Sequence, residues 1–331
     1  MISNSNHWLF QQSINIPDKV AIISAEQSIT YHELFNLSKI FANYLIQEGI
    51  TPKTNVGILV NHSFEFFIIL NSIWLIGAVA VPLNPNSKLE ELEYQIKKTE
   101  IFFLISNDEY FIKQNLNVNL ILYHNNHIKE QFNSTYYNFN KDESALIMFT
   151  SGSTAKPKAV VHTFNSLYNH VNNLSKCINL SSDDFWLLSL PLYHIGGFMI
   201  LIRSLILGST VIFPNSLKAN DIAKSFNFSP THASFVSTML NNFYNDNILL
   251  PKSLKYIFLG GGPIDNELFM FFKDHYKNIL KVYGSTETCS MVTLLFQNDN
   301  YNETVGKPIN EFIEIRINTN ENERVGEILI K

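Results

Sequence analysis

The chain has 331 residues, of which 46% are hydrophobic and 16% are charged, and its formal net charge is −5. A chain of this size can bury more than one core, and its composition is that of a globular protein. The mild charge without a basic stripe disfavours a nucleic-acid partner, and two distant cysteines, Cys177 and Cys289, disfavour a disulfide framework or a zinc site.

The N-terminal part alternates between strand-like and helix-like segments. A short helix precedes the strand Val20–Ile23, and Ser28–Thr30 then leads into a helix that continues to about Gln47. Thr30 is the predicted N-cap of that helix, and Glu33 would complete a capping box. Further strands are expected at 56–60, 78–85 and 101–106, and further helices at 63–77 and 89–99. Such alternation predicts a layered α/β domain.

The alternation resumes after a less regular stretch at 107–142, which carries one more expected strand at 120–123. Helices are expected at 166–178, 199–207, 219–227, 236–245 and 267–276, and strands at 145–149, 186–189, 210–213 and 256–259. After Tyr283, short strand-like pieces at 313–317 and 327–330 have no helix between them. We therefore predict two layered α/β subdomains, at about 1–142 and 143–282, packed together with a small β-barrel-like unit at 283–331.

Targeting and membrane signals are weak in this sequence. The N-terminus, MISNSNHWLFQQ, has no basic region followed by an apolar core, so no secretory signal is visible. The longest apolar stretches, 64–81 and 198–207, contain polar residues and predict buried elements rather than membrane spans. We expect a cytoplasmic protein. The abundance of Asn, Ile, Phe and Lys indicates an AT-rich genome, which leaves the plastid stroma as the alternative.

The segment Thr150–Lys158, TSGSTAKPK, holds four hydroxyl side chains, one Gly and two Lys in nine residues. Hydroxyls and backbone N–H groups donate to phosphate oxygens, Gly lets the backbone approach, and Lys supplies positive charge. The alternative is a polar turn between two strands. The segment is not a Walker A motif, because Ala155 and Lys156–Lys158 stand where a second Gly and a Lys-Ser/Thr pair belong, so a P-loop NTPase is disfavoured.

Four further segments carry residue types that a packed core does not need. PLYHIGG at 191–197 places His194 in a loop before an apolar helix, where a lone His is more often structural. GGGP at 260–263 either lets the backbone approach a ligand or a neighbouring segment closely, or forms a tight turn. YGSTET at 283–288 combines an aromatic ring, hydroxyls and a carboxylate, and VGKP at 305–308 is a turn.

In this order, and with GEILIK at 326–331, these motifs resemble the adenylate-forming enzymes: acyl- and aryl-CoA ligases, luciferases and peptide-synthetase adenylation domains. The resemblance extends over essentially the whole chain. It implies activation of a carboxylic acid by attack on the α-phosphate of ATP, release of pyrophosphate, and capture of the acyl-adenylate by the thiol of CoA. ATP, Mg²⁺ and the co-substrate CoA are the implied ligands.

The resemblance also implies residue roles. Thr286 would contact the α-phosphate, Glu287 would hold Mg²⁺, and His194 would close over the carboxylate, so these three are the candidate catalytic residues. Gly261 would line the acyl pocket as well as the adenine pocket. The candidate nucleotide-binding residues are Thr150, Ser151, Gly152, Ser153, Thr154, Lys158, Gly260, Gly261, Gly262, Tyr283, Gly284 and Thr286.

Ala155 departs from the family, which most often has Gly at this position. If the position requires a positive φ, Ala would cost roughly 1 kcal/mol. We therefore expect weaker ATP binding rather than its loss.

The segment after His194 bears on the choice of acid. Peptide-synthetase domains place an Asp there, whereas this chain has none in 195–203 and instead carries Arg203. An Arg in an apolar helix is costly unless it has a partner. The first reading is that Arg203 snorkels or pairs with a structural carboxylate, and the second is that it binds a second carboxylate of the substrate. With the second reading, the pattern is most similar to the o-succinylbenzoate–CoA ligase subfamily of menaquinone synthesis. A generic acyl- or aryl-CoA ligase, or a nucleotide-binding remnant without turnover, is the alternative.

The chain ends at Lys331, where the resemblance implies that a small C-terminal domain with a catalytic Lys should follow. We therefore expect this chain alone to bind ATP and the acid but to adenylate poorly. A separate C-terminal domain or a second copy of the chain is the expected macromolecular partner, with no nucleic acid and no membrane span.

Overall fold

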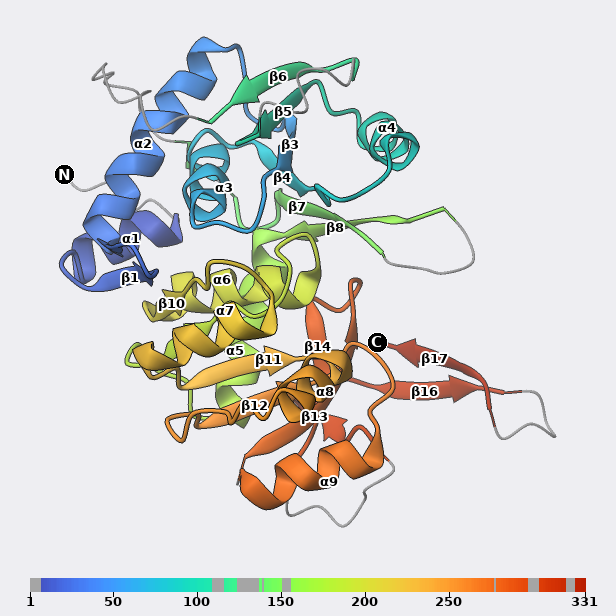
Figure 1. Ribbon diagram of the computed structural model, residues 1–331. Helices are drawn as coiled ribbons and strands as arrows, with labels where there is room; N and C mark the ends of the chain where they lie inside the picture. Colours follow the sequence, from blue (N-terminus) through green and yellow to red (C-terminus); the bar gives the residue numbers. More distant parts are fainter. Residues whose placement is uncertain are drawn as a thin grey trace.

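In the computed structural model, the strands form one large sheet, one small sheet and a C-terminal hairpin (Figure 1). The structure describes residues 7–108, 116–123, 137–138, 140–150, 156–276, 278–296, 304–319 and 325–331. The predicted α/β class is confirmed, with helices packed against the faces of both sheets.

The small sheet contains six strands in the order β6-β5-β3-β4-β7-β8. Neighbours are parallel except β7 and β8, which are antiparallel. Parallel strands buried on both faces are apolar throughout, which explains the continuous runs in the sequence. The strands are β3 (Asn55–Leu59), β4 (Val79–Pro82), β5 (Phe103–Ser106), β6 (Asn119–Leu122), β7 (Ser144–Phe149) and β8 (Ala159–Thr163).

The large sheet contains nine strands in the order β15-β14-β13-β12-β11-β9-β10-β1-β2. Its edge strands β1 and β2 come from the N-terminus, and β1 pairs in parallel with β10, with Ile22 opposite Val211. The strands are β1 (Val20–Ile23), β2 (Ser28–Thr30), β9 (Phe185–Leu187), β10 (Thr210–Ile212), β11 (His232–Phe235), β12 (Tyr256–Leu259), β13 (Ile279–Ser285), β14 (Ser290–Leu295) and β15 (Lys307–Pro308).

The two sheets exchange segments across the expected boundary near residue 142. The large sheet takes β1 and β2 from the first part of the chain, and the small sheet takes β7 and β8 from the second. Subdomain boundaries near 142 and 282 therefore stay a prediction, because hydrogen-bonded sheets alone do not define folding units.

The helices lie close to their predicted positions, and the Thr30–Glu33 capping box is present. α6 begins four residues earlier than the expected residue 199 and includes Gly197. A Cβ atom on Gly197 would lie 2.2 Å from the Pro191 oxygen, so glycine allows the first turn of α6 to pack on the preceding loop. The helices are α1 (Trp8–Asn15), α2 (Tyr31–Gln47), α3 (Glu65–Leu75), α4 (Leu89–Lys98), α5 (Phe164–Cys177), α6 (Ile195–Leu207), α7 (Ala219–Lys224), α8 (Ser237–Asn245) and α9 (Asn266–His275), with a 3₁₀ turn at Ser225–Phe228.

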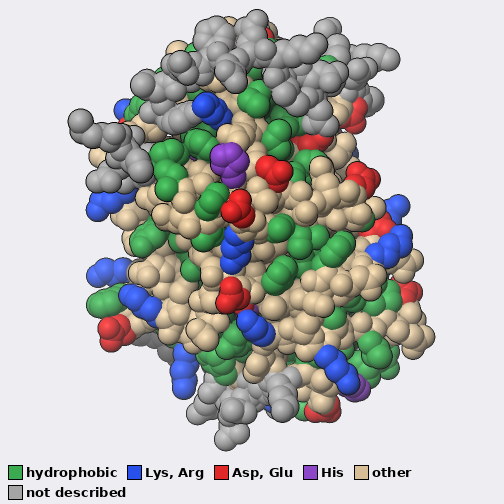
Figure 2. Space-filling model, turned by 90° about the vertical axis from the view of Figure 1, so that its left-hand side faces the viewer, with side chains coloured by type: hydrophobic (Ala, Val, Ile, Leu, Met, Phe, Trp, Pro, Cys, Tyr) green, Lys and Arg blue, Asp and Glu red, His purple; other side chains and the backbone are tan. Residues whose placement is uncertain are grey.

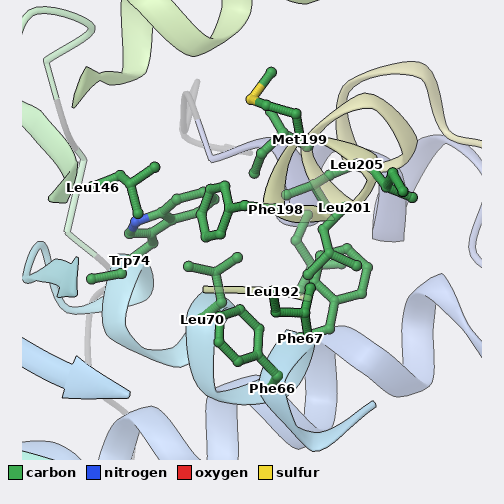
Figure 3. Packing of buried hydrophobic residues seen from close by; sticks show 14 of the residues in the cluster. Phe66, Phe67, Leu70, Trp74, Leu146, Leu192, Phe198, Met199, Leu201 and Leu205 are labelled. Carbon is green, nitrogen blue, oxygen red and sulfur yellow. The ribbon is translucent and has the colours of Figure 1, made fainter. Parts of the chain in front are cut away.

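The main core lies where α3 meets α6, and it joins the two sheets (Figure 3). Trp74 of α3 packs edge-on against Phe198 of α6, with ring centroids 6.4 Å apart. The Trp74 indole also donates a hydrogen bond to the Ala145 carbonyl at 2.8 Å, which ties α3 to β7. No described helix has the length and apolar character needed to cross a bilayer.

The C-terminal region differs from the expected β-barrel-like unit. β14 and β15 extend the large sheet, and β16 (Ile315–Asn318) pairs only with β17 (Glu327–Ile330) in a separate antiparallel hairpin. The described residues therefore form no closed barrel. The reason is local, because β13 turns directly into β14 and continues the sheet edge. On the face shown in Figure 2, side chains of both charges are interspersed.

Candidate active site

A cavity of about 1010 Å³ opens at the carboxyl ends of the parallel strands of the large sheet. Ser189 follows β9, Val236 follows β11, Gly261 follows β12, and Tyr283 lies at the end of β13. Ligands of open parallel sheets bind at such strand ends. The topology therefore brings together, in one cavity, motifs that are almost 100 residues apart in the sequence.

The glycine triplet forms one wall of the cavity. A Cβ atom on Gly260 would lie 2.8 Å from the Val282 oxygen, and Gly261 has a φ of +81°, a left-handed conformation that favours glycine. A Cβ atom on Gly262 would have no neighbour within 4 Å, so this residue of the cavity lining borders open space. The triplet thus combines a close strand contact, a left-handed turn and an accessible backbone.

The end of β13 and the turn after it form the neighbouring wall. Tyr283, Gly284 and Thr286 line the cavity, whereas the exposed Glu287 is the next residue and is not among the lining side chains. The Ser285 amide donates to Thr288 Oγ1 at 2.9 Å and closes the turn. A Cβ atom on Gly284 would lie 1.6 Å from the Ser290 oxygen, so only glycine permits this closure.

The hydroxyl-rich segment begins and ends at a hydrogen-bonded pair. The Thr150 amide donates to the Lys158 carbonyl at 3.0 Å, and the Lys158 amide donates to Thr150 Oγ1 at 3.1 Å. Within the segment, Lys156 lies over the Tyr94 ring, 5.2 Å from its centroid. The other predicted phosphate ligands, Ser151, Gly152, Ser153 and Thr154, and also Ala155, lie outside the described residues.

His194 is the N-cap residue of α6 and lines the cavity together with Ile195 and Gly196. The N-terminus of a helix carries partial positive charge and favours an anion. Desolvation lowers the pKa of His194, which favours the neutral imidazole. The Tyr193 ring is tilted against it, with centroids 4.7 Å apart. A neutral histidine beside a helix N-terminus suits a carboxylate ligand.

Arg203 lies two turns further along α6, is fully buried and does not line the cavity. None of its three guanidinium nitrogens has a hydrogen-bond partner among the described residues. The guanidinium lies 5.3 Å from the centre of the Trp186 ring, and burial lowers the pKa of Arg203 to about 9. The predicted structural carboxylate partner is absent from this part of the structure.

A hollow of about 120 Å³ adjoins the cavity, and Arg203 is not among its lining residues. It shares Gly196 and Gly261 with the cavity and is also lined by Phe258 and Met291. Phe258 stacks on Trp186 with ring centroids 5.8 Å apart, and Trp186 in turn contacts Arg203. Phe258 and Trp186 therefore form a chain of contacts from the lining of the hollow to the buried cation.

Lys281 lines the cavity, although the sequence analysis did not predict it. Its ammonium donates to Asn266 Oδ1 at 3.3 Å and lies 4.2 Å from the Phe269 ring centre. Burial lowers its pKa, with a smaller effect from Lys273. Strand periodicity could have predicted it: in a strand, residues 281 and 283 lie on the same face, so a role for Tyr283 implies a place for Lys281 beside it. The VGKP turn was also given no role, but Thr304 and Val305 complete the rim.

A metal site would have to be built mainly around Glu287. Among the described residues, no three His, Cys, Asp or Glu side chains converge on a possible metal ion. Mg²⁺ is usually held by one or two carboxylates together with substrate phosphates, so a single exposed carboxylate beside a phosphate site fits it.

The chain is similar in sequence to known proteins over most of its length. The 2-succinylbenzoate–CoA ligase of Bacillus subtilis (strain 168) is 29% identical over 318 residues, covering 93% of this chain and 65% of that protein. The enzyme of the same name from Staphylococcus epidermidis is 27% identical over 332 residues, covering 98% of this chain and 68% of that protein. The chain thus spans less than two thirds of the length of the Bacillus relative.

The structure is similar to solved ones over the same extent. The Bacillus subtilis o-succinylbenzoate CoA synthetase, in complex with its acyl-adenylate intermediate, has a TM-score of 0.91 at 30% identity, covering 98% of this chain and 69% of that chain. The N-terminal domain of FACL13 from Mycobacterium tuberculosis has a TM-score of 0.86 at 22% identity, covering 98% and 87%, and supports the fold alone. The sequence matches the family described as AMP-binding enzyme over residues 9–331, so the chain belongs to that family.

Proposed function

We propose that this chain provides the acid-activating site of an AMP-forming acid–CoA ligase, with 2-succinylbenzoate as the acid, in menaquinone or phylloquinone biosynthesis. The observation that carries the proposal is the single cavity at the strand ends. There the glycine triplet, the Tyr283–Thr286 turn and the N-terminus of α6 meet. A cytoplasmic site of action, or the plastid stroma, is part of the same proposal.

ATP would occupy the cavity between the two glycine-containing walls. Tyr283 offers its ring to the adenine, and the open backbone at Gly261 and Gly262 allows close approach. Thr286 would donate to the α-phosphate, and the segment between Thr150 and Lys158 would hold the β- and γ-phosphates. Mg²⁺, when bound at Glu287, neutralises phosphate charge.

The reaction requires two anions to meet. A carboxylate oxygen attacks the α-phosphorus, the bond to the bridging oxygen breaks, and pyrophosphate leaves; the thiol of CoA then displaces AMP from the acyl carbon. The N-terminus of α6 and the neutral His194 ring would hold the carboxylate without adding negative charge. This arrangement lowers the electrostatic cost of the encounter.

The choice of acid rests on Arg203. A buried guanidinium without a hydrogen-bond partner among the described residues is costly unless a ligand supplies the partner. A second substrate carboxylate would supply that partner; because Arg203 lines neither the cavity nor the hollow, the Phe258 and Trp186 rings would have to move aside to admit it. A generic acyl- or aryl-CoA ligase lacks a use for this cation. A nucleotide-binding remnant would keep it without turnover.

The test is ATP–pyrophosphate exchange with a panel of acids: 2-succinylbenzoate, benzoate, a fatty acid and an amino acid. It should be run with the chain alone and with the remaining third of the Bacillus relative supplied as a separate protein. We expect slow exchange by the chain alone, faster exchange in the mixture, and preference for 2-succinylbenzoate. Preference for the fatty acid or the amino acid contradicts the substrate, and rapid CoA-thioester formation by the chain alone contradicts the expected dependence on a second part.

A further inference from the structure

We propose that His162 is a positioning residue that fixes the Thr286–Glu287 turn against the strand that follows the phosphate segment. The inference rests on the proposed function and extends it to a residue with no assigned role. His162 lies in β8, four positions after Lys158. It is the one buried residue of that strand, with 3% of its surface exposed. Its neighbour Val161 is 55% exposed and points away from this core.

The contact between His162 and the turn crosses from one sheet to the other. His162 is paired with Leu146 in the small sheet, and its Nδ1 lies 3.1 Å from Cys289 Sγ, at the start of β14 in the large sheet. Burial raises the pKa of the Cys289 thiol to about 11, so the thiol keeps its proton and can donate to a neutral imidazole whose Nδ1 is unprotonated. The Thr286 carbonyl and the Glu287 carboxylate also face the ring and favour its protonated form, against the effect of burial.

The turn needs such an external contact because its backbone is strained. Cys289 and Ser290 are consecutive non-glycine residues with φ of 57° and 95°. Such conformations persist only where surrounding contacts impose them. The Cys289 amide donates to the Thr286 carbonyl at 3.3 Å, so the strained residue and the proposed α-phosphate ligand belong to one closed turn. A hydrogen bond at Cys289 therefore fixes where Thr286 and Glu287 stand.

This geometry has a functional consequence. The phosphate segment starts and ends in the small sheet, whereas Thr286 and Glu287 are presented by the large sheet. The two groups must hold one polyphosphate and its Mg²⁺ at a fixed separation. The His162–Cys289 hydrogen bond links the two supports directly beside that site.

The test measures ATP binding by calorimetry, with Mg²⁺ and separately with EDTA, and unfolding by urea. Loss of the hydrogen bond in His162→Leu or Cys289→Ala should weaken Mg·ATP binding about tenfold. Binding in EDTA should weaken less, about threefold, because only the contact of Thr286 with the α-phosphate is then affected. His162→Asn keeps an acceptor near the Nδ1 position and should restore binding to within about threefold. Val161→Ala and Cys177→Ala are the matched controls and should bind as the unaltered chain does.

Combination with Glu287→Gln sharpens the test. If His162 acts through the turn, the losses in Mg·ATP affinity from His162→Leu and Glu287→Gln should not add. Unchanged binding, or an equal loss with and without Mg²⁺, overturns the positioning role; lower stability with intact Mg·ATP binding makes His162 a structural residue only. Should His162→Leu not fold, Cys289→Ala and His162→Asn decide. Failure of the unaltered chain to bind Mg·ATP overturns the proposed function instead.

Discussion

The two most apolar helices, α3 and α6, meet in the same core but differ in how the polar side chains buried in them are hydrogen-bonded. In α3, Ser72 donates to the Ser38 and Ile68 carbonyls at 2.9 and 2.7 Å, and Asn71 Nδ2 donates to the Phe67 carbonyl at 2.8 Å, so only the neutral Asn71 Oδ1 lacks a partner among the described residues of this helix. In α6, neither the Arg203 guanidinium nor the Ser204 hydroxyl has a hydrogen-bond partner among the described residues.

This difference separates a structural helix from a functional one. A buried polar group whose hydrogen bonds are made within the chain stabilises one packing arrangement. A buried cation without such a partner destabilises the protein by itself, and it is retained where a ligand completes it. The helix whose N-terminus enters the cavity is also the one that carries a buried cation without a hydrogen-bond partner among the described residues.

The largest expected effect is that of Arg203→Met. The variant should lose about 10- to 100-fold of its discrimination between 2-succinylbenzoate and an analogue lacking the second carboxylate, because one charged interaction is removed. Its free energy of unfolding without ligand should rise by about 1–2 kcal/mol, since a buried cation is replaced by an apolar chain. Pyrophosphate exchange and urea unfolding measure the two effects. Ser204→Ala is the control, and a large stability loss with unchanged preference would show a structural arginine.

A second expected effect concerns pH and the histidine that faces Arg203. Burial and the Arg203 charge lower the pKa of His170 to about 3, and its Nε2 lies 3.0 Å from the Met291 oxygen. The unfolded chain takes up a proton near pH 6.5 and the folded chain does not, so stability is lost as pH falls from 6.5. From pH 7 to 5 this one group should cost about 2 kcal/mol.

The variant His170→Gln keeps a donor for the Met291 carbonyl but does not titrate in this range. Urea unfolding at pH 7 and pH 5 should show that the variant loses about 2 kcal/mol less than the unaltered chain over this interval. Equal losses in the two proteins would mean that His170 takes up its proton in the folded state.

The smallest expected effect is that of Ser72→Ala in α3. Removal of the hydroxyl should lower the free energy of unfolding by about 1 kcal/mol, because the bond to the Ser38 carbonyl is lost and the apolar packing remains. The order of preference among acids should stay the same in pyrophosphate exchange. A changed preference would remove the contrast between the two helices.

Local signals in the sequence predicted much of this fold. The Thr30 capping box depends only on neighbouring residues, and it was predicted correctly. The glycine triplet and the Tyr283 turn were predicted from unusual composition, and both line the cavity.

Features that depend on distant contacts were missed. β11 is a short strand whose alternation is weak, and its central place between β9 and β12 comes from the sheet. The pairing of β1 with β10 leaves no trace in either segment, because parallel partners share no local pattern. Lys281 was missed because a lysine on a strand is usually solvated, whereas here Asn266 and Phe269 cover it.

The exchange of edge strands between the sheets has a consequence for synthesis on the ribosome. All strands of the small sheet are complete by Thr163, so that sheet can form while the chain is still growing. β1 can pair with β10 only after about 190 further residues have been synthesised. At a synthesis rate of 5–20 residues per second, this takes roughly 10–40 s. During that interval the β1–β2 pair presents an unpaired edge, so the N-terminus is the segment that most needs protection by a chaperone.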